Sequence, residues 1–330
     1  MISSTTAPRA LKERLKKLAT PAPPAQLRRR FRRLDADAAA TIESALRQHY
    51  FARSDSYLES EEGRNDLQDH VHRRLDLFRA TVIPWFHSAR ALDGVEILEI
   101  GCGTGSSTVA LAEQGSRVVA VDILPGSLAV ARERCRLYGL PAEFHEANAI
   151  DVSKRLRGRR FDMIIFFAAL EHMTHTERLT AMQRTWAMLP PGGLWCVVET
   201  PNRLWFHDSH TSHLPFFHWL PDQLAFAYSR FSPRASLADR FDRPSDSAML
   251  DFLRLGRGVS FHEFELAMDR LDRLQVVSSL QIYLRRRSLL RRVLWKLTQD
   301  SRYESFLAQL QPGAHPGFFH ANLDLILRKS

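Results

Sequence analysis

The chain of 330 residues is predicted to adopt an α/β fold built on a mostly parallel sheet, and two observations support this. First, residues 95–123 read as an apolar strand, a glycine-rich turn, a helix and a second apolar strand. Second, the same alternation of short apolar runs and helical segments continues to about residue 200. Strands that alternate with helices in this way form parallel sheets with helices on both faces.

The first strand shows no polar alternation, as expected for a strand that is buried on both faces. Its apolar residues are Val95, Ile97, Leu98 and Ile100. Gly101, Gly103 and Gly105 follow at every second position, so the backbone can turn sharply and approach a ligand without Cβ atoms in the way. The hydroxyls of residues 106–108 are expected to cap the next helix. Asp122 ends the second strand, where nucleoside-binding α/β folds place the carboxylate that accepts from ribose hydroxyls.

The residues around these glycines distinguish between two nucleoside cofactors. A dinucleotide-binding turn reads Gly-x-Gly-x-x-Gly, but Ser106 stands at the position of the third glycine. Glu99 precedes the glycines, and a carboxylate repels a pyrophosphate but attracts an α-ammonium group. The segment therefore resembles the first motif of the class I S-adenosylmethionine-dependent methyltransferases. The resemblance implies S-adenosyl-L-methionine as the cofactor. It also implies a Rossmann-like seven-stranded sheet, mostly parallel with an antiparallel last strand, with helices on both faces.

The resemblance continues in register to residue 203. Residues 143–152 look like the third strand and its loop, where Asn148 would bond to the adenine amino group and the Ala149 backbone would reach the ring. Residues 161–173 match the fourth strand and its turn, and residues 187–203 match a helix end, a Pro-Gly-Gly turn and the fifth strand. The cofactor-binding residues implied by the resemblance are Glu99, Gly101, Cys102, Gly103, Gly105, Asp122, Ile123, Asn148, Ala149 and Phe167.

The chain divides into five expected regions. These are a basic, disordered arm (1–34), an N-terminal helical cap (35–92), the S-adenosylmethionine-binding core (93–200), an insertion that serves as substrate lid (201–273), and a C-terminal part that completes the core (274–330). The last part is expected to hold strands at 274–284 and 318–329 and a basic amphipathic helix at 285–296. In the cap, Tyr57, Asp66, His70 or Arg73 could line the cofactor pocket.

The net charge of +9 belongs to the arm, because residues 1–34 contain ten basic residues and one acidic residue. An excess of basic residues often indicates nucleic-acid binding, but here the excess lies in the arm and is absent from the catalytic core. A solvated tail is the first interpretation of the arm, and weak contact with anionic lipid or another polyanion is the second. Its arginine-rich, acid-poor composition also resembles a mitochondrial transit peptide.

The cysteines and the hydropathy bear on localisation. Cys102, Cys135 and Cys196 are odd in number and lie in predicted buried elements, which favours a reducing, cytoplasmic compartment. No apolar stretch approaches the roughly 20 residues that span a bilayer, and no secretory signal is visible. The sequence gives no indication of the oligomeric state.

Candidate catalytic residues follow the fourth and fifth strands. His172 is the first candidate for a base, and Glu171 beside it could assist or could instead cap the next helix. The insertion places four histidines among many aromatic residues, a composition that predicts a partly apolar pocket. Of these, His210 and His213 are further catalytic candidates, although a structural role for any single histidine is an open alternative.

A metal-assisted variant of the reaction is a second possibility at this turn. Some quinone-pathway and small-RNA O-methyltransferases have Glu-x-x-Glu-His here and a further histidine beyond the fifth strand, which together hold a divalent ion. Ala168 replaces the first carboxylate, and the loss of a hard oxygen ligand argues against magnesium. His207, Asp208, His210 and His213 could form a nitrogen-rich site instead. Metal-free transfer is the prediction.

The predicted activity is O-methylation of a small organic acceptor, with His172 or an insertion histidine as base. The basic arm leaves open a lipid, quinone, glycan or RNA acceptor. A different class of protein, an NAD-binding oxidoreductase or a non-catalytic nucleoside-binding protein, is the remaining alternative.

Overall fold

The computed structural model describes residues 27, 31–51, 55–238, 240–241, 243–287, 293, 295–296 and 298–330, and the structural statements below concern these residues. They form a seven-stranded sheet with the strand order β3-β2-β1-β4-β5-β7-β6. The strands are β1 (Glu96–Ile100), β2 (Arg117–Asp122), β3 (Glu143–Glu146), β4 (Met163–Phe167), β5 (Leu194–Pro201), β6 (Gln275–Ser279) and β7 (Asn322–Arg328).

Adjacent strands from β3 to β5 pair in parallel, and β7 is antiparallel to both β5 and β6. The predicted Rossmann-like sheet is confirmed. Alternate residues of each strand pack into separate cores on the two faces. Ile97 and Ile165 lie in one core, whereas Leu98 and Ile164 lie in the other. Burial on both faces explains why these strands are apolar at consecutive positions.

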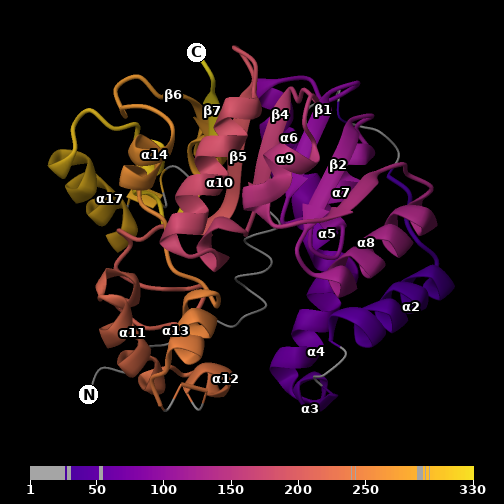
Figure 1. Cartoon of the computed structure of the whole chain (residues 1–330), viewed down its shortest axis with the longest axis horizontal. Helices are drawn as coiled ribbons and strands as arrows, with labels where there is room; N and C mark the ends of the chain where they lie inside the picture. The colour runs from indigo at the N-terminus through magenta and orange to yellow at the C-terminus, as the bar shows by residue number, and fades with distance from the viewer. Residues whose placement is uncertain are drawn as a thin grey trace.

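One face of the sheet is covered by helices that precede and follow β1 (Figure 1). The N-terminal helices are α2 (Ala36–Ala45), η2 (Leu46–Tyr50), α3 (Asp55–Glu59), α4 (Glu61–Gln68), η3 (Asp69–Arg73), α5 (Arg74–Leu77), η4 (Phe78–Val82) and α6 (Ile83–Ala89). The helices α7 (Ser106–Ala112) and α8 (Pro125–Tyr138) pack on the same face. The N-terminal helices contact α7 and α8 directly.

The opposite face is covered by helices from the core, the insertion and the C-terminal part. They are η5 (Ala149–Asp151), α9 (Val152–Arg155), η6 (Leu170–His172), α10 (His175–Met188), α14 (Phe261–Ala267), α17 (Gln299–Leu310) and η9 (Pro316–Phe319). The helix α17 was not predicted from the sequence.

The rest of the insertion folds around a small core of its own, which includes Phe217, Phe226 and Phe252. Its helices are η7 (Phe217–Trp219), α11 (Asp222–Tyr228), η8 (Ser229–Phe231), α12 (Ala235–Ala238) and α13 (Asp246–Leu253). In Figure 1, α11, α12 and α13 lie together below α10, on the other side of the view from α3 and α4. Several aromatic residues of the insertion therefore fill a packed core of its own.

Two expectations for the chain ends need correction. The strand expected at 274–284 stops at Ser279, and the chain continues as helix α15 (Leu280–Arg287). Leu280 and Leu284 are both buried, and their spacing of four residues matches one face of a helix. In the arm, Leu27 is buried in the core and the carbonyl of Arg32 accepts from Arg79, so ordered contacts begin before residue 35.

The basic helix expected at 285–296 is only partly described, since residues 288–292, 294 and 297 lie outside the described residues, as do residues 1–26 and 28–30 of the arm. The described end of this segment is held by Arg285, which donates to Glu304 at 2.8 and 2.9 Å. No helix in the described part of the chain combines the length and apolarity needed to cross a membrane.

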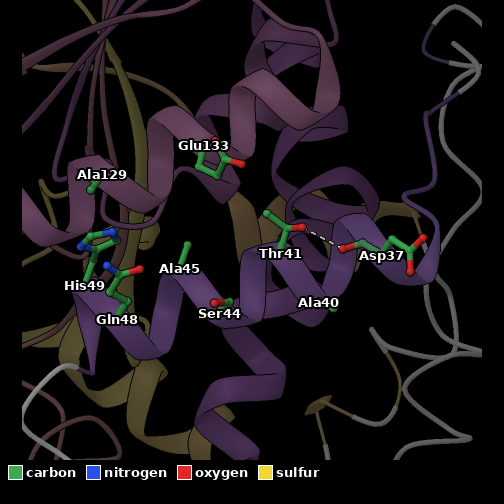
Figure 2. Close-up of a pocket in the computed structure, with 9 residues that line it drawn as sticks. All are labelled: Asp37, Ala40, Thr41, Ser44, Ala45, Gln48, His49, Ala129 and Glu133. Atoms are coloured by element: carbon green, nitrogen blue, oxygen red, sulfur yellow. Dashed lines mark hydrogen bonds between the residues drawn. The ribbon is translucent and has the colours of Figure 1, made fainter.

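A shallow groove of about 590 Å³ runs between α2 and α8 on the surface (Figure 2). It is lined by Asp37, Ala40, Thr41, Ser44, Ala45, Gln48, His49, Ala129 and Glu133. None of the predicted site residues lines it.

Candidate functional site

The glycine-rich turn after β1 is shaped by two close backbone approaches. A Cβ at Gly101 would lie 2.8 Å from the carbonyl oxygen of Phe167, and one at Gly105 would lie 2.8 Å from Ala131. Both glycines have positive φ, which side chains disfavour. Gly103 also has positive φ but faces open space within 4 Å. The turn is therefore tight on its protein side and open at Gly103, where a ligand can approach.

Asp122 lies beside this opening at the end of β2. Its carboxylate accepts from the backbone N–H of Gly103 at 2.8 Å and of Leu124 at 2.9 Å. Burial raises the pKa of Asp122, while these backbone donors and the charge of His172 oppose the rise. Ile123 and Leu124, which follow Asp122, expose 52% and 55% of their surface, so they form an apolar surface directly beside this opening. Ile123 was among the predicted cofactor-binding residues, and Leu124 was not.

Glu99 has partners inside the protein. It is fully buried, and both of its oxygens accept from helix α7, one from Ser107 and the other from Thr108 at 2.6 Å. The expectation that these hydroxyls cap α7 is therefore wrong, because the N-cap is Gly105 and no side chain caps the helix. Burial raises the pKa of Glu99 to about 7. Direct contact of Glu99 with an α-ammonium group stays a prediction.

Two other predicted cofactor-binding residues, Asn148 and Phe167, make contacts within the protein. The Oδ1 of Asn148 accepts from the backbone N–H of Ile150 at 3.2 Å and keeps a second lone pair for a ligand. The ring of Phe167 is buried against Phe78, with ring centroids 5.3 Å apart. Any contact of Phe167 with a cofactor must therefore come from its backbone. Ala149 is buried at the start of η5.

The N-terminal helices contact the glycine-rich turn directly. His70 on η3 lies 3.0 Å from the Thr104 hydroxyl, through its Nδ1. The buried Arg134 donates to the carbonyls of Thr104 at 2.8 Å and His70 at 2.6 Å. Burial, together with the charges of Arg74 and Arg134, lowers the pKa of His70 to about 3. Of the other cap residues considered, Tyr57 donates to Asp66 at 3.2 Å. Arg73 pairs with Asp69 on the surface.

Glu171 lies in the turn after β4, completely buried. Its Oε2 accepts from the Thr200 hydroxyl at 3.1 Å, whereas its Oε1 has no hydrogen-bond partner among the described residues. Burial raises the pKa of this carboxyl. Glu171 does not cap the next helix, because Thr174 and Glu177 form a capping box at the start of α10. A buried, unpartnered carboxylate oxygen calls for a proton donor or a cation.

Two histidines face this oxygen. The Nε2 of His172 lies 3.9 Å from Glu171 Oε1, and the Nε2 of His210 lies 3.7 Å from the same atom. The metal-ligating atoms of these three residues all lie within 4.8 Å of one another. The Glu–His–His cluster is the name used below for Glu171, His172 and His210.

Hydrogen bonds on the far side of each ring set the tautomers of both histidines. The Nδ1 of His172 lies 2.9 Å from the carbonyl of Arg254, which can only accept, so Nδ1 carries the proton. The Thr211 hydroxyl donates to the carbonyl of Gly256 at 3.1 Å and therefore accepts from His210 Nδ1, which is 3.1 Å away. In the neutral form of each ring, the Nε2 atom that faces Glu171 is therefore the one that carries the lone pair. Burial, followed by the charge of His172, lowers the pKa of His210 to about 4, which keeps it neutral near pH 7.

The other insertion histidines lie apart from this cluster. His213 and His207 are exposed, and His213 has positive φ. His218 is buried with its Nε2 at 3.2 Å from Asp208, whose carboxylate also accepts from the backbone N–H of His210, Thr211 and Ser212. Asp208 thus organises the turn that carries His210. An aspartate followed closely by small polar residues is a turn signal that could have indicated this.

The insertion also reaches the N-terminal helices. Arg234 donates to the carbonyls of His210 and Thr211, each at 3.1 Å. The same guanidinium pairs with Glu62 of α4 at 3.1 Å. Through Arg234, the turn that carries His210 is therefore connected to α4.

Comparison with known proteins agrees with this geometry. Residues 97–193 match the family model described as a methyltransferase domain. The ubiquinone biosynthesis O-methyltransferase of Azorhizobium caulinodans is 31% identical over 134 residues, which cover 39% of this chain and 51% of that protein. The protein of the same name from Ruegeria pomeroyi is 32% identical over 34% of this chain and 44% of its own length. The chain spans about half the length of the curated relatives it matches.

Similarity to solved structures is more distant. The magnesium protoporphyrin IX methyltransferase of Synechocystis PCC 6803, with bound SAM, is 18% identical with a TM-score of 0.37, over 52% of this chain and 80% of that one. The sheet order, the open glycine-rich turn with Asp122 beside it, and the family match over the same residues agree with one another. The chain therefore carries a methyltransferase domain of the class I, S-adenosylmethionine-dependent type.

Proposed function

We propose that the protein transfers a methyl group from S-adenosylmethionine to a hydroxyl oxygen of a small organic acceptor. The observation that carries this proposal is the Glu–His–His cluster, in which the Nε2 atoms of two imidazoles lie 3.9 and 3.7 Å from the same oxygen of Glu171. The turn that carries Glu171 and His172 follows β4, which pairs with β1, and Ala169 in this turn would lie 2.8 Å from a Cβ at Gly101, which supports a location of the cluster beside the predicted cofactor site. The name of the curated relatives, O-methyltransferases, supports an oxygen acceptor.

Each residue of the proposed site has a distinct role in the transfer. When bound, S-adenosylmethionine supplies a methyl group that its sulfonium already activates. Asp122 accepts from the ribose hydroxyls, and the open backbone at Gly103 admits the amino-acid end. His172 or His210 takes the acceptor's hydroxyl proton on Nε2 as the oxygen bonds to the methyl carbon, the carbon–sulfur bond breaks and S-adenosylhomocysteine is left. The Glu171 carboxylate, 3.7 to 3.9 Å from both rings, then stabilises the imidazolium.

The first test uses methyl-deuterated S-adenosylmethionine and a panel of phenols and catechols, with 3,4-dihydroxybenzoate as the reference probe. Mass spectrometry should detect transfer of the labelled methyl group to oxygen. His172→Gln and His210→Gln should lower kcat by 10²- to 10⁴-fold if they remove the general base, at unchanged affinity for S-adenosylhomocysteine. The matched control is His175→Gln, at the exposed start of α10. Equal losses in the control would remove the cluster from the mechanism.

Metal-assisted transfer at the same cluster is the second candidate, and the unpartnered Glu171 Oε1 favours it. Glu171, His172 and His210 would hold the ion, and this set of two imidazoles and one carboxylate suits zinc, manganese or ferrous iron better than magnesium. Such an ion would supply Lewis-acid catalysis at the acceptor oxygen. Activity that EDTA removes and Zn²⁺ or Mn²⁺ restores, with metal found by elemental analysis, would establish this variant.

A lipid, quinone, glycan or RNA acceptor is the alternative that the basic arm suggests, and the relatives' name adds weight to a quinone precursor. Because Leu27 is buried, the arm should be truncated at residue 26. Unchanged acceptor affinity and salt dependence after this truncation would remove the arm from acceptor binding. Calorimetry with S-adenosylmethionine and NAD tests the broader alternative, since binding of NAD alone would contradict a methyltransferase.

A further inference from the structure

A short segment at the end of the insertion, residues 254–258, contacts all three members of the Glu–His–His cluster. It lies between α13 and α14. The carbonyl of Arg254 accepts from His172 Nδ1 at 2.9 Å, and the N–H of Arg257 donates to the carbonyl of Glu171 at 2.9 Å. Between them, the carbonyl of Gly256 accepts from Thr211, the residue that holds His210 Nδ1.

The segment is anchored on both sides by buried arginines. Arg178 of α10 donates to the carbonyls of Arg257 at 3.0 Å and of Leu170 at 2.8 Å, so it ties the segment to the turn that carries Glu171. The guanidinium of Arg257 donates to the carbonyls of Phe217 at 2.9 Å and Leu220 at 2.6 Å in the insertion. Satisfied buried cations of this kind are costly to displace, so the segment is held firmly.

Gly256 is the point at which the segment meets His210. Its φ is +132°, a conformation that side chains rarely adopt. A Cβ here would lie 2.5 Å from Thr211 Oγ1 and 3.0 Å from His210 Nδ1. Any side chain would therefore push apart the hydroxyl and ring nitrogen whose contact directs His210 Nε2 toward Glu171.

We propose that residues 254–258 form the positioning segment of the Glu–His–His cluster, and that Gly256 is the positioning residue for His210. The structural part of this proposal stands on the contacts alone, whereas its consequence for turnover rests on the proposed function. Gly256 touches no substrate in this scheme and acts through the orientation of His210.

The test is Gly256→Ala, with two glycine controls. Gly158→Ala places a side chain at φ +82° in open space, so it reproduces the backbone strain without the contact, and Gly313→Ala introduces neither. Long-range ¹⁵N–¹H NMR of histidine-labelled protein reports the protonated nitrogen of each ring, with His172→Gln and His210→Gln assigning the signals. Wild type and both controls should show Nδ1-protonated rings for His172 and His210, and Gly256→Ala should change the His210 signals.

Kinetics with 3,4-dihydroxybenzoate should show a kcat about 10²-fold lower for Gly256→Ala, with affinity for S-adenosylhomocysteine unchanged. Thr211→Val, which removes the bridging hydroxyl without adding bulk, should change the same His210 signals even if Gly256→Ala fails to fold. Wild-type His210 signals in either folded variant would overturn the proposal. A wild-type protein that binds no S-adenosylhomocysteine would instead contradict the proposed function, and the NMR comparison would still decide the role of the segment.

Discussion

Glu99 shows how one buried carboxylate connects the first strand to the cofactor turn. Its oxygens accept from Ser107 and Thr108, so β1 and α7 are bonded directly to each other across the glycine-rich turn that joins them. Glu99 was predicted to attract a ligand ammonium group, and that contact has yet to be tested. Its hydrogen bonds could not be read from the sequence, because Ser107 and Thr108 are equally suited to capping a helix.

The raised pKa of Glu99 predicts a pH-dependent stability. A carboxyl whose pKa is about 7 in the folded protein and 4.5 in its ordinary, unfolded environment binds more protons in the folded state between these values. Its stabilising effect is therefore complete below about pH 4.5 and is lost as the pH rises through 7, on the order of 3 kcal/mol in all. Urea unfolding at pH 5 and pH 8 should show that Glu99→Gln loses less stability than wild type across this interval. Glu146→Gln, at an exposed strand end, serves as control. Parallel pH curves for wild type and Glu99→Gln would contradict this assignment.

Asp122 gives a second prediction at this scale. If its carboxylate accepts from the ribose, Asp122→Ala should weaken binding of S-adenosylhomocysteine by about 1.5 to 3 kcal/mol. Asp122→Asn, which keeps an acceptor oxygen for the Gly103 N–H, should lose less. Calorimetry measures both variants, and unchanged binding by Asp122→Ala would remove the carboxylate from the cofactor site.

At the level of elements, α10 supports the turn that carries Glu171 and His172. Its first turn is closed by the reciprocal bonds of Thr174 and Glu177, and its Arg178 holds the carbonyl of Leu170 in the turn itself. The capping residues lie outside the Glu–His–His cluster. These capping residues stabilise α10, and α10 in turn holds the turn that carries Glu171 and His172 through Arg178.

Removing the cap should therefore cost stability. Thr174→Ala should lower the free energy of unfolding by about 1 kcal/mol, as other N-cap replacements do. Thr41→Ala on the exposed face of α2, where the hydroxyl only donates to the Asp37 carbonyl, is the comparison. Chemical denaturation provides the measurement, and equal effects of the two substitutions would show that the capping box adds nothing.

Across the whole molecule, the core was predictable and the insertion was not. The buried strands β1, β2, β4 and β5 can be recognised in the sequence as apolar runs, and the turns after them carry local motifs. The end of β6 was missed because Leu280 and Leu284 suit a strand and a helix equally until tertiary packing selects one. In the cluster, Glu171, His172 and His210 were named, but Gly256 and Arg257 were missed, because their contacts join residues far apart in the chain.

The ion pair between Glu62 and Arg234 has a consequence for how long the insertion and α4 stay in contact. Both side chains are partly open to solvent, so the pair is worth about 1 kcal/mol or less and is screened by added salt. The insertion and α4 are thus held together here by an ion pair that thermal motion breaks readily. Stopped-flow release of S-adenosylhomocysteine should accelerate with ionic strength in wild type and become insensitive to salt in Glu62→Gln. In that case, the rate at which this ion pair breaks sets the time for which S-adenosylhomocysteine stays bound, and the rate of methyl transfer does not affect that time.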